Sequence, residues 1–102
     1  MIVNLDANNI QKEIENGLKL VVFSAKWCSY CQRQKDVFRE LPDIWIGEVD
    51  GDKNPNLVSQ YGVMGFPTFI LFKNGKEINK FSGYKNKFEL MNILTKLSLI
   101  HI

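Results

Sequence analysis

Two cysteines, Cys28 and Cys31, are the residues whose type and spacing could support covalent chemistry in this chain. They are its only cysteines, and two residues separate them. Thiol–disulfide exchange needs one accessible thiolate that attacks a disulfide and a second thiol that resolves the mixed disulfide. Because a two-residue spacing on the first turn of a helix brings two sulfurs together, we expect Cys28 to attack and Cys31 to resolve.

The segments that flank the cysteines predict a junction between a strand and a helix. The apolar run from Leu20 to Phe23 predicts a strand within residues 19–25 that is covered on both faces. The sequence from Gln32 to Leu41 predicts a helix. A cysteine pair at such a junction is typical of redox motifs. The start of a helix favours a thiolate because its first backbone N–H groups have no partners within the helix.

Helices and strands alternate along the rest of the chain. The other expected elements are a helix capped by Asp6, a strand over Ile44–Val49, a short helix capped by Asn54, a strand over Thr68–Phe72, a hairpin that turns at Asn74-Gly75 and a last helix over Lys87–Leu99. A further strand over Ile2–Leu5 would raise the strand count from four to five. This order predicts a single α/β domain over residues 1–102, with a central mixed sheet of four or five strands flanked by about four helices.

Apolar residues recur on one side of each predicted helix. They are Ile10 and Ile14 on the first helix, Val37, Phe38 and Leu41 on the second, Leu57, Val58 and Tyr61 on the third, and Phe88, Met91, Leu94 and Leu97 on the last. Spacings of three and four residues place such side chains on one helical face. We therefore expect these faces to cover the sheet.

The composition excludes several classes of function. A hydrophobic fraction of 45% favours a compact core, and a net charge of +2 with scattered lysines favours no nucleic-acid or membrane-surface role. The N-terminus lacks the basic and apolar regions of a signal peptide, and no stretch approaches the roughly 20 apolar residues of a membrane helix. We expect a monomer in the cytoplasm, where disulfides tend to be transient and catalytic.

Several segments give the chain a resemblance to thioredoxins along nearly its whole length. They are Phe23–Cys28, Asp52–Pro55, Tyr61–Val63, Gly65–Thr68, Leu71–Gly75 and Phe81–Gly83. The resemblance implies a thioredoxin-like fold and the reduction of protein disulfides, with electrons from a reductase or a small thiol and without a cofactor.

The same resemblance implies a groove for substrate beside the cysteines. Pro67 is expected in the cis form facing the two sulfurs, which leaves the backbone of Phe66 free to pair with an extended substrate segment. Gly83 is expected beside this groove, although a turn glycine after a strand is an equal alternative. Trp27 and Tyr30 are expected to flank the groove, the alternatives being partly buried packing for Trp27 and a plain spacer for Tyr30.

Two positions depart from the thioredoxin pattern in ways that bear on chemistry. Val22 stands where thioredoxins usually have a buried aspartate that helps to deprotonate the resolving cysteine. Glu48 stands where the family often has lysine, and we hypothesise that it approaches Cys31 as a substitute carboxylate. The alternative is that Glu48 is a solvated surface group. Ser29 and Tyr30 also replace the usual Gly-Pro between the cysteines, and resemble the Pro-Tyr pair of glutaredoxins.

Three alternatives to a thioredoxin-like reductant follow from these residues. Tyr30 favours a glutaredoxin-like enzyme that depends on glutathione. The cysteine pair could supply half of a zinc site, with His101 or carboxylates as the other ligands. Val22 also fits a non-catalytic binding module. A disulfide that closes so short a loop would add little stability, which favours a functional over a structural pair.

Overall fold

The computed structural model describes residues 1–101, and the side chains of residues 1–97. In this part of the chain, five strands form one mixed sheet in the order β1-β3-β2-β4-β5. The strands are β1 (Ile2–Leu5), β2 (Leu18–Ser24), β3 (Ile46–Asp50), β4 (Thr68–Lys73) and β5 (Lys76–Ser82). β3 lies parallel to both β1 and β2, whereas β4 lies antiparallel to both β2 and β5. The predicted mixed sheet is confirmed, with the N-terminal strand as its fifth member.

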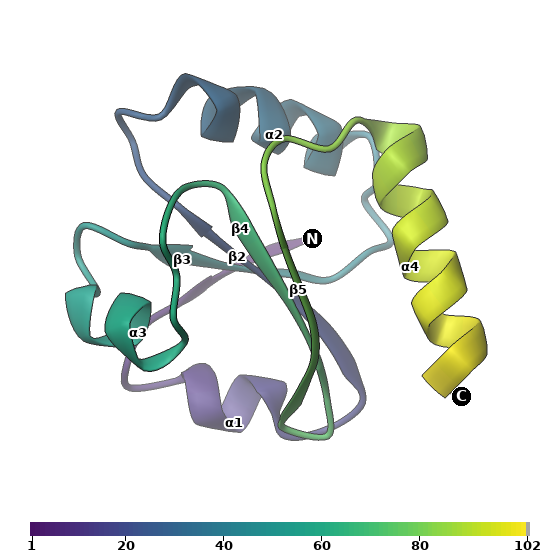
Figure 1. The fold of residues 1–102 in the computed structure, drawn as a ribbon, viewed down its shortest axis with the longest axis horizontal. Helices are drawn as coiled ribbons and strands as arrows, with labels where there is room; N and C mark the ends of the chain where they lie inside the picture. The colour runs from purple at the N-terminus through teal and green to yellow at the C-terminus, as the bar shows by residue number, and fades with distance from the viewer. Residues whose placement is uncertain (102) are drawn as a thin grey trace.

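Helices cover both faces of the sheet (Figure 1). One face carries α1 (Ile10–Ile14) and α3 (Pro55–Gln60), and the other carries α2 (Ser29–Arg39) and α4 (Lys87–His101). The four consecutive apolar residues of β2 alternate between these two layers and are all buried. Val21 and Phe23 pack toward α1 and α3, whereas Leu20 and Val22 pack toward α2 and α4. The run was apolar throughout because this central strand has a helical layer on each side.

The turn between β4 and β5 follows the prediction from its sequence. Asn74 and Gly75 both have positive φ, at 50° and 84°, as a type I′ hairpin requires. The backbone N–H of Asn74 donates to the carbonyl of Gly17 at 2.9 Å, and its side-chain oxygen accepts the N–H of Gly17 at 2.7 Å. These two bonds hold the hairpin tip against the loop that precedes β2.

The buried face of α4 differs from the predicted one. Phe88 is 80% exposed and Met91 is also exposed, whereas Leu90 is fully buried, with Leu94 and Leu97 packed partly behind it. Positions 90, 94 and 97 follow the same three- and four-residue spacing as the predicted set. The pattern was ambiguous because apolar residues occur on more than one side of this helix.

The starts of three helices also differ from the predictions. The helix after Asp6 begins only at Ile10, and the Asp6 carboxylate instead accepts the N–H groups of Asn8 and Asn9 in the turn before it. Asn54 does precede α3, but its side chain makes no cap and donates to the carbonyl of Asp50 at 2.9 Å. α2 spans Ser29–Arg39 rather than 32–41, so its first turn includes the second cysteine.

Candidate active site

The cysteine pair lies where β2 leads into α2. Cys28 is the last residue before the helix, with extended backbone angles (φ −85°, ψ 112°). Its Sγ accepts the backbone N–H of Cys31 at 3.3 Å, one of the N–H groups that have no partner within the helix. Both cysteines are free thiols. A sulfur that accepts a backbone N–H at a helix start is well placed to carry negative charge.

The two thiols differ in their surroundings. Cys28 is 7% exposed, whereas Cys31 is only 2% exposed. Burial raises the pKa of the Cys31 thiol to about 12, and its contact with Cys28 and the charge of Glu48 add to the rise, against a lowering by its hydrogen bond with the Ala25 backbone. Cys31 therefore holds its proton at neutral pH until a base removes it.

Two aromatic residues, Trp27 and Phe66, lie next to Cys28. The exposed ring of Trp27 meets the ring of Phe66 edge-on, with the centroids 5.9 Å apart. Phe66 packs against the small buried cluster of Ala25, Cys28 and Cys31. Its carbonyl accepts a long hydrogen bond from the Cys28 thiol at 3.7 Å. The Phe66–Pro67 peptide bond is cis, as the resemblance implied.

A groove with a volume of about 460 Å³ lies beside this cis bond. Phe66, Pro67 and Gly83 line it together, as the resemblance implied. Gly83 has a positive φ of 88°, and its N–H donates to the carbonyl of Pro67 at 2.9 Å. Gly83 is thus both a turn glycine and a wall of the groove. Trp27 and Tyr30 are exposed near the cysteines and do not line this groove.

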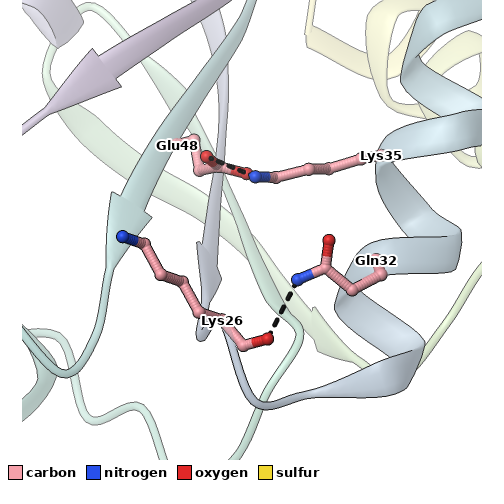
Figure 2. Close-up of polar contacts among 4 residues, drawn as sticks. All are labelled: Lys26, Gln32, Lys35 and Glu48. Carbon is pink, nitrogen blue, oxygen red and sulfur yellow. Dashed lines mark hydrogen bonds and ion pairs between the residues drawn. The ribbon is translucent and has the colours of Figure 1, made fainter.

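A second hollow, of about 440 Å³, lies on the inner side of Cys31 and is lined by Lys35 and Glu48 as well as Cys31. Figure 2 shows Glu48 of β3 and Lys35 of α2 pointing toward one another, with Glu48 Oε1 3.4 Å from Lys35 Nζ. The Glu48 side chain is only 13% exposed, and its Oε2 is buried with no hydrogen-bond partner among the described residues. Glu48 therefore lies in the site's interior, not on the open surface.

Comparison with known proteins identifies the family. The thioredoxin family model matches residues 1–96. The chain belongs to the thioredoxin family. Thioredoxin from Chlamydia trachomatis is 37% identical over 100 residues, covering 94% of this chain and 98% of that protein. Thioredoxin from Staphylococcus epidermidis is 36% identical over 100 residues, covering 93% and 96%.

A solved structure agrees with the sequence relatives. A mutant thioredoxin from Halobacterium salinarum superposes with a TM-score of 0.84 at 27% identity, covering 93% of this chain and 88% of that one. Membership in the thioredoxin family makes this protein a thiol–disulfide oxidoreductase. The family in general acts on protein disulfides and works with a reductase. The expectation of a thiol–disulfide oxidoreductase is confirmed, and the close pair of free thiols is consistent with a dithiol motif.

The structure also bears on two other expectations, that of no membrane helix and the alternative of a zinc site. No helix among the described residues is long and apolar enough to cross a membrane. The zinc alternative needed His101 or carboxylates as further ligands. The His101 side chain lies outside the described residues, and among those described no three His, Cys, Asp or Glu side chains lie together as a metal site would need.

Sequence reasoning missed two residues that shape the thioredoxin site. Gln34 is 1% exposed on α2, where its amide donates to the carbonyl of Lys85 at 2.9 Å and accepts the N–H of Lys85 at 2.8 Å. Gly51 leaves room for the ring of Phe66, which a Cβ there would overlap. The position of Gln34 on the apolar side of the helix, three residues after Cys31, was a usable signal. No local signal marked Gly51.

Proposed function

We propose that Cys28 and Cys31 reduce protein disulfides in two steps. The Cys28 thiolate attacks a substrate disulfide, forms a mixed disulfide and releases one substrate thiolate. Cys31 then loses its proton and attacks Cys28 Sγ, which releases the second substrate thiolate and leaves a Cys28–Cys31 disulfide. The substrate gains two electrons and the protein loses two. The observation that carries this order is the hydrogen bond from the Cys31 N–H to the more accessible sulfur of Cys28.

The groove beside the cis peptide bond is proposed to hold the substrate. An extended segment there would pair with the backbone of Phe66, against Pro67 and Gly83. Trp27 and Tyr30 are exposed and adjacent in sequence to Cys28 and Cys31, so their rings can cover the mixed disulfide. Backbone pairing supplies affinity for many sequences, as suits an enzyme with many protein substrates.

Glu48 is proposed to accept the proton of Cys31. It lines the same hollow as Cys31, and its Oε2 has a free lone pair in a buried position. Lys35 offsets the cost of burying the carboxylate through its contact at 3.4 Å with Oε1. The hollow also contains the charged residues Asp6, Lys26, Asp50 and Lys53, so the proton has polar groups through which to reach solvent.

The setting of the reaction follows from the same chemistry. Electrons pass directly between sulfurs, so we propose that the protein works without a bound cofactor. We also propose that residues 1–102 act as one domain and as a monomer. A thioredoxin reductase is the proposed electron donor, and a small thiol is the alternative. The cytoplasm is the proposed compartment because thiols are kept reduced there, and this enzyme must hold its cysteines reduced in order to reduce a substrate.

The reduction potential of the cysteine pair tests this function against its glutaredoxin-like alternative, which the exposed Tyr30 favours. The protein would be equilibrated with a graded series of thiol–disulfide buffers. A value near about −270 mV is expected for a thioredoxin-like reductant, whereas about −200 mV or above indicates a glutaredoxin-like or oxidising role. The lack of a reversible two-electron couple would contradict both.

A further inference from the structure

Two lysines border the groove, each held in place by backbone carbonyls. Lys80 of β5 donates from Nζ to the carbonyl of Tyr61 at 2.7 Å. Lys85, in the loop after β5, donates from Nζ to the carbonyls of Ser82 at 2.8 Å and Gly83 at 3.3 Å. A carbonyl fixes an ammonium without neutralising its charge. Because an ammonium has three N–H donors, each lysine keeps at least one for a ligand.

Both ammonium groups lie against glycines that line the groove. A Cβ on Gly62 would lie 3.2 Å from Lys80 Nζ, and one on Gly83 would lie 3.7 Å from Lys85 Nζ. Gly62 and Gly83 belong to two different loops, and both line the groove. The two positive charges are thus fixed beside the space that a substrate segment would occupy.

Neither Lys80 nor Lys85 forms an ion pair among the described residues. Among the described residues, the ion pairs join Lys35 to Glu48 and Arg39 to Asp36, and the groove lining contains no acidic side chain. In the neighbouring loops, the carboxylate of Asp50 accepts the backbone N–H groups of Asp52 and Lys53, and Glu89 accepts the N–H of Asn86. The positive charge at the groove therefore remains available to a partner.

We propose that this groove selects protein substrates whose target cysteine lies in an extended acidic segment, with Lys80 and Lys85 contacting its Asp or Glu side chains. The inference rests on the proposed use of the groove by substrate. Met64, which is fully exposed, lies with Phe66 and Phe81 along the groove and supplies apolar contact. Complementary charge then sets partner choice and the rate of association.

Two peptides with one disulfide each test the proposal. They share a sequence except that acidic residues flank the target cysteine in one and lysines flank it in the other. We expect kcat/KM to be roughly tenfold higher for the acidic peptide at low salt, and the ratio to fall toward one in about 1 M salt. Lys80→Glu and Lys85→Glu should each lower the ratio, and the double variant should reverse it.

A matched variant separates local charge from net charge. Lys76→Glu makes the same charge change at the exposed hairpin end, away from the groove, and should keep the wild-type ratio. An equal effect of Lys76→Glu and Lys80→Glu would overturn the proposal, as would equal rates for the two peptides. Faster reduction of glutathione disulfide than of the acidic peptide would overturn the assignment to a protein segment.

A further variant tells a failure of this inference from a failure of the proposed groove. Gly65 lines the groove, and a Cβ there would meet no atom within 4 Å. Gly65→Phe adds a ring at a groove-lining position whose Cβ has room, and should slow the reduction of both peptides if substrate occupies the groove. If Gly65→Phe has no effect, the groove does not bind substrate; if it slows both peptides equally and their rates are the same, only the charge selection is wrong.

Discussion

Glu48 of β3 lies directly beside Val22 of β2 in the parallel register, so both side chains leave the sheet on the face that α2 covers. Val22 is buried in an apolar cluster, whereas Glu48 reaches the hollow that also contains Cys31. The carboxylate expected at position 22 from the thioredoxin resemblance is thus found one strand away. Lys35 of α2, the helix that covers this face, forms an ion pair with the Glu48 carboxylate.

Replacing Glu48 by Gln should slow the resolving step. The amide cannot take a proton from Cys31, and positioned general bases typically contribute about 10²-fold or more. Single-turnover oxidation of the reduced protein by a disulfide substrate, followed by tryptophan fluorescence between pH 6 and about 10, measures this rate. Asp52→Asn is the control, since it removes the same charge from an exposed loop residue. Rates for Glu48→Gln equal to those of the wild type at every pH would remove Glu48 from the mechanism.

The buried thiol of Cys31 should make the stability of the reduced protein fall at high pH. Its pKa is raised from 9.0 to about 12 in the folded state, so between these values the folded protein binds a proton that the unfolded chain has lost. The contribution of this thiol to the free energy of unfolding is fully present below pH 9. Above pH 9 the free energy of unfolding falls by at most about 1.4 kcal/mol per pH unit. Urea unfolding of reduced wild type and Cys31→Ser at several pH values measures the difference. Parallel stability curves for the two proteins would be the contrary result.

A methyl group at Gly51 should disturb the aromatic cover of the cysteines. The new Cβ would overlap the Phe66 ring, which packs against the cluster that contains the cysteines and meets Trp27 edge-on. Gly51→Ala should lower the free energy of unfolding by about 1–3 kcal/mol, as overpacking does, and change the tryptophan fluorescence of the protein. Gly65→Ala, where a Cβ meets nothing within 4 Å, should change stability by less than about 0.5 kcal/mol. Equal effects of the two substitutions would contradict this prediction, because they would show that the Phe66 ring moves aside at no cost in stability.

Gln34 should hold the loop that carries Lys85. Its buried amide makes two hydrogen bonds to the Lys85 backbone, and Leu in its place would leave both backbone groups without that partner. Gln34→Leu should cost about 1–3 kcal/mol of stability and speed amide exchange of Lys85. Gln32→Leu, on the exposed side of the same helix, removes one exposed bond and should cost less than about 0.5 kcal/mol. Unchanged exchange at Lys85 would contradict the role of Gln34.

The sequence predicted those parts of the fold that have a local cause. The Asn74-Gly75 turn, the central strand at Leu20–Phe23 and the cysteines at a helix start each follow from residues adjacent in the chain. The face of α4 was wrong because Phe88 and Leu90 are both apolar, and only contact with the sheet decides which is buried. A helical spacing alone does not distinguish them.

The site was predicted to the same limit. The cysteine pair and Pro67 carried recognisable motifs, and the hypothesis that Glu48 approaches Cys31 came from the resemblance to thioredoxins, which often have lysine at that position. Contacts between residues far apart in the chain had no such signal: Gln34 binds Lys85, and Gly51 makes room for Phe66. These contacts depend on how loops meet above the sheet, which the hydrophobic pattern does not encode.

Trapping of the mixed disulfide tests the roles of the two cysteines most directly. Reduced Cys31→Ser and Cys28→Ser variants would each be mixed with a protein disulfide substrate, quenched with acid and analysed by intact-mass spectrometry. The account predicts that Cys31→Ser accumulates a stable mixed disulfide through Cys28, whereas Cys28→Ser forms none at a comparable rate because its remaining thiol is buried and protonated. Rapid trapping through Cys31 in the Cys28→Ser variant would contradict the assignment of Cys28 as the attacking thiol.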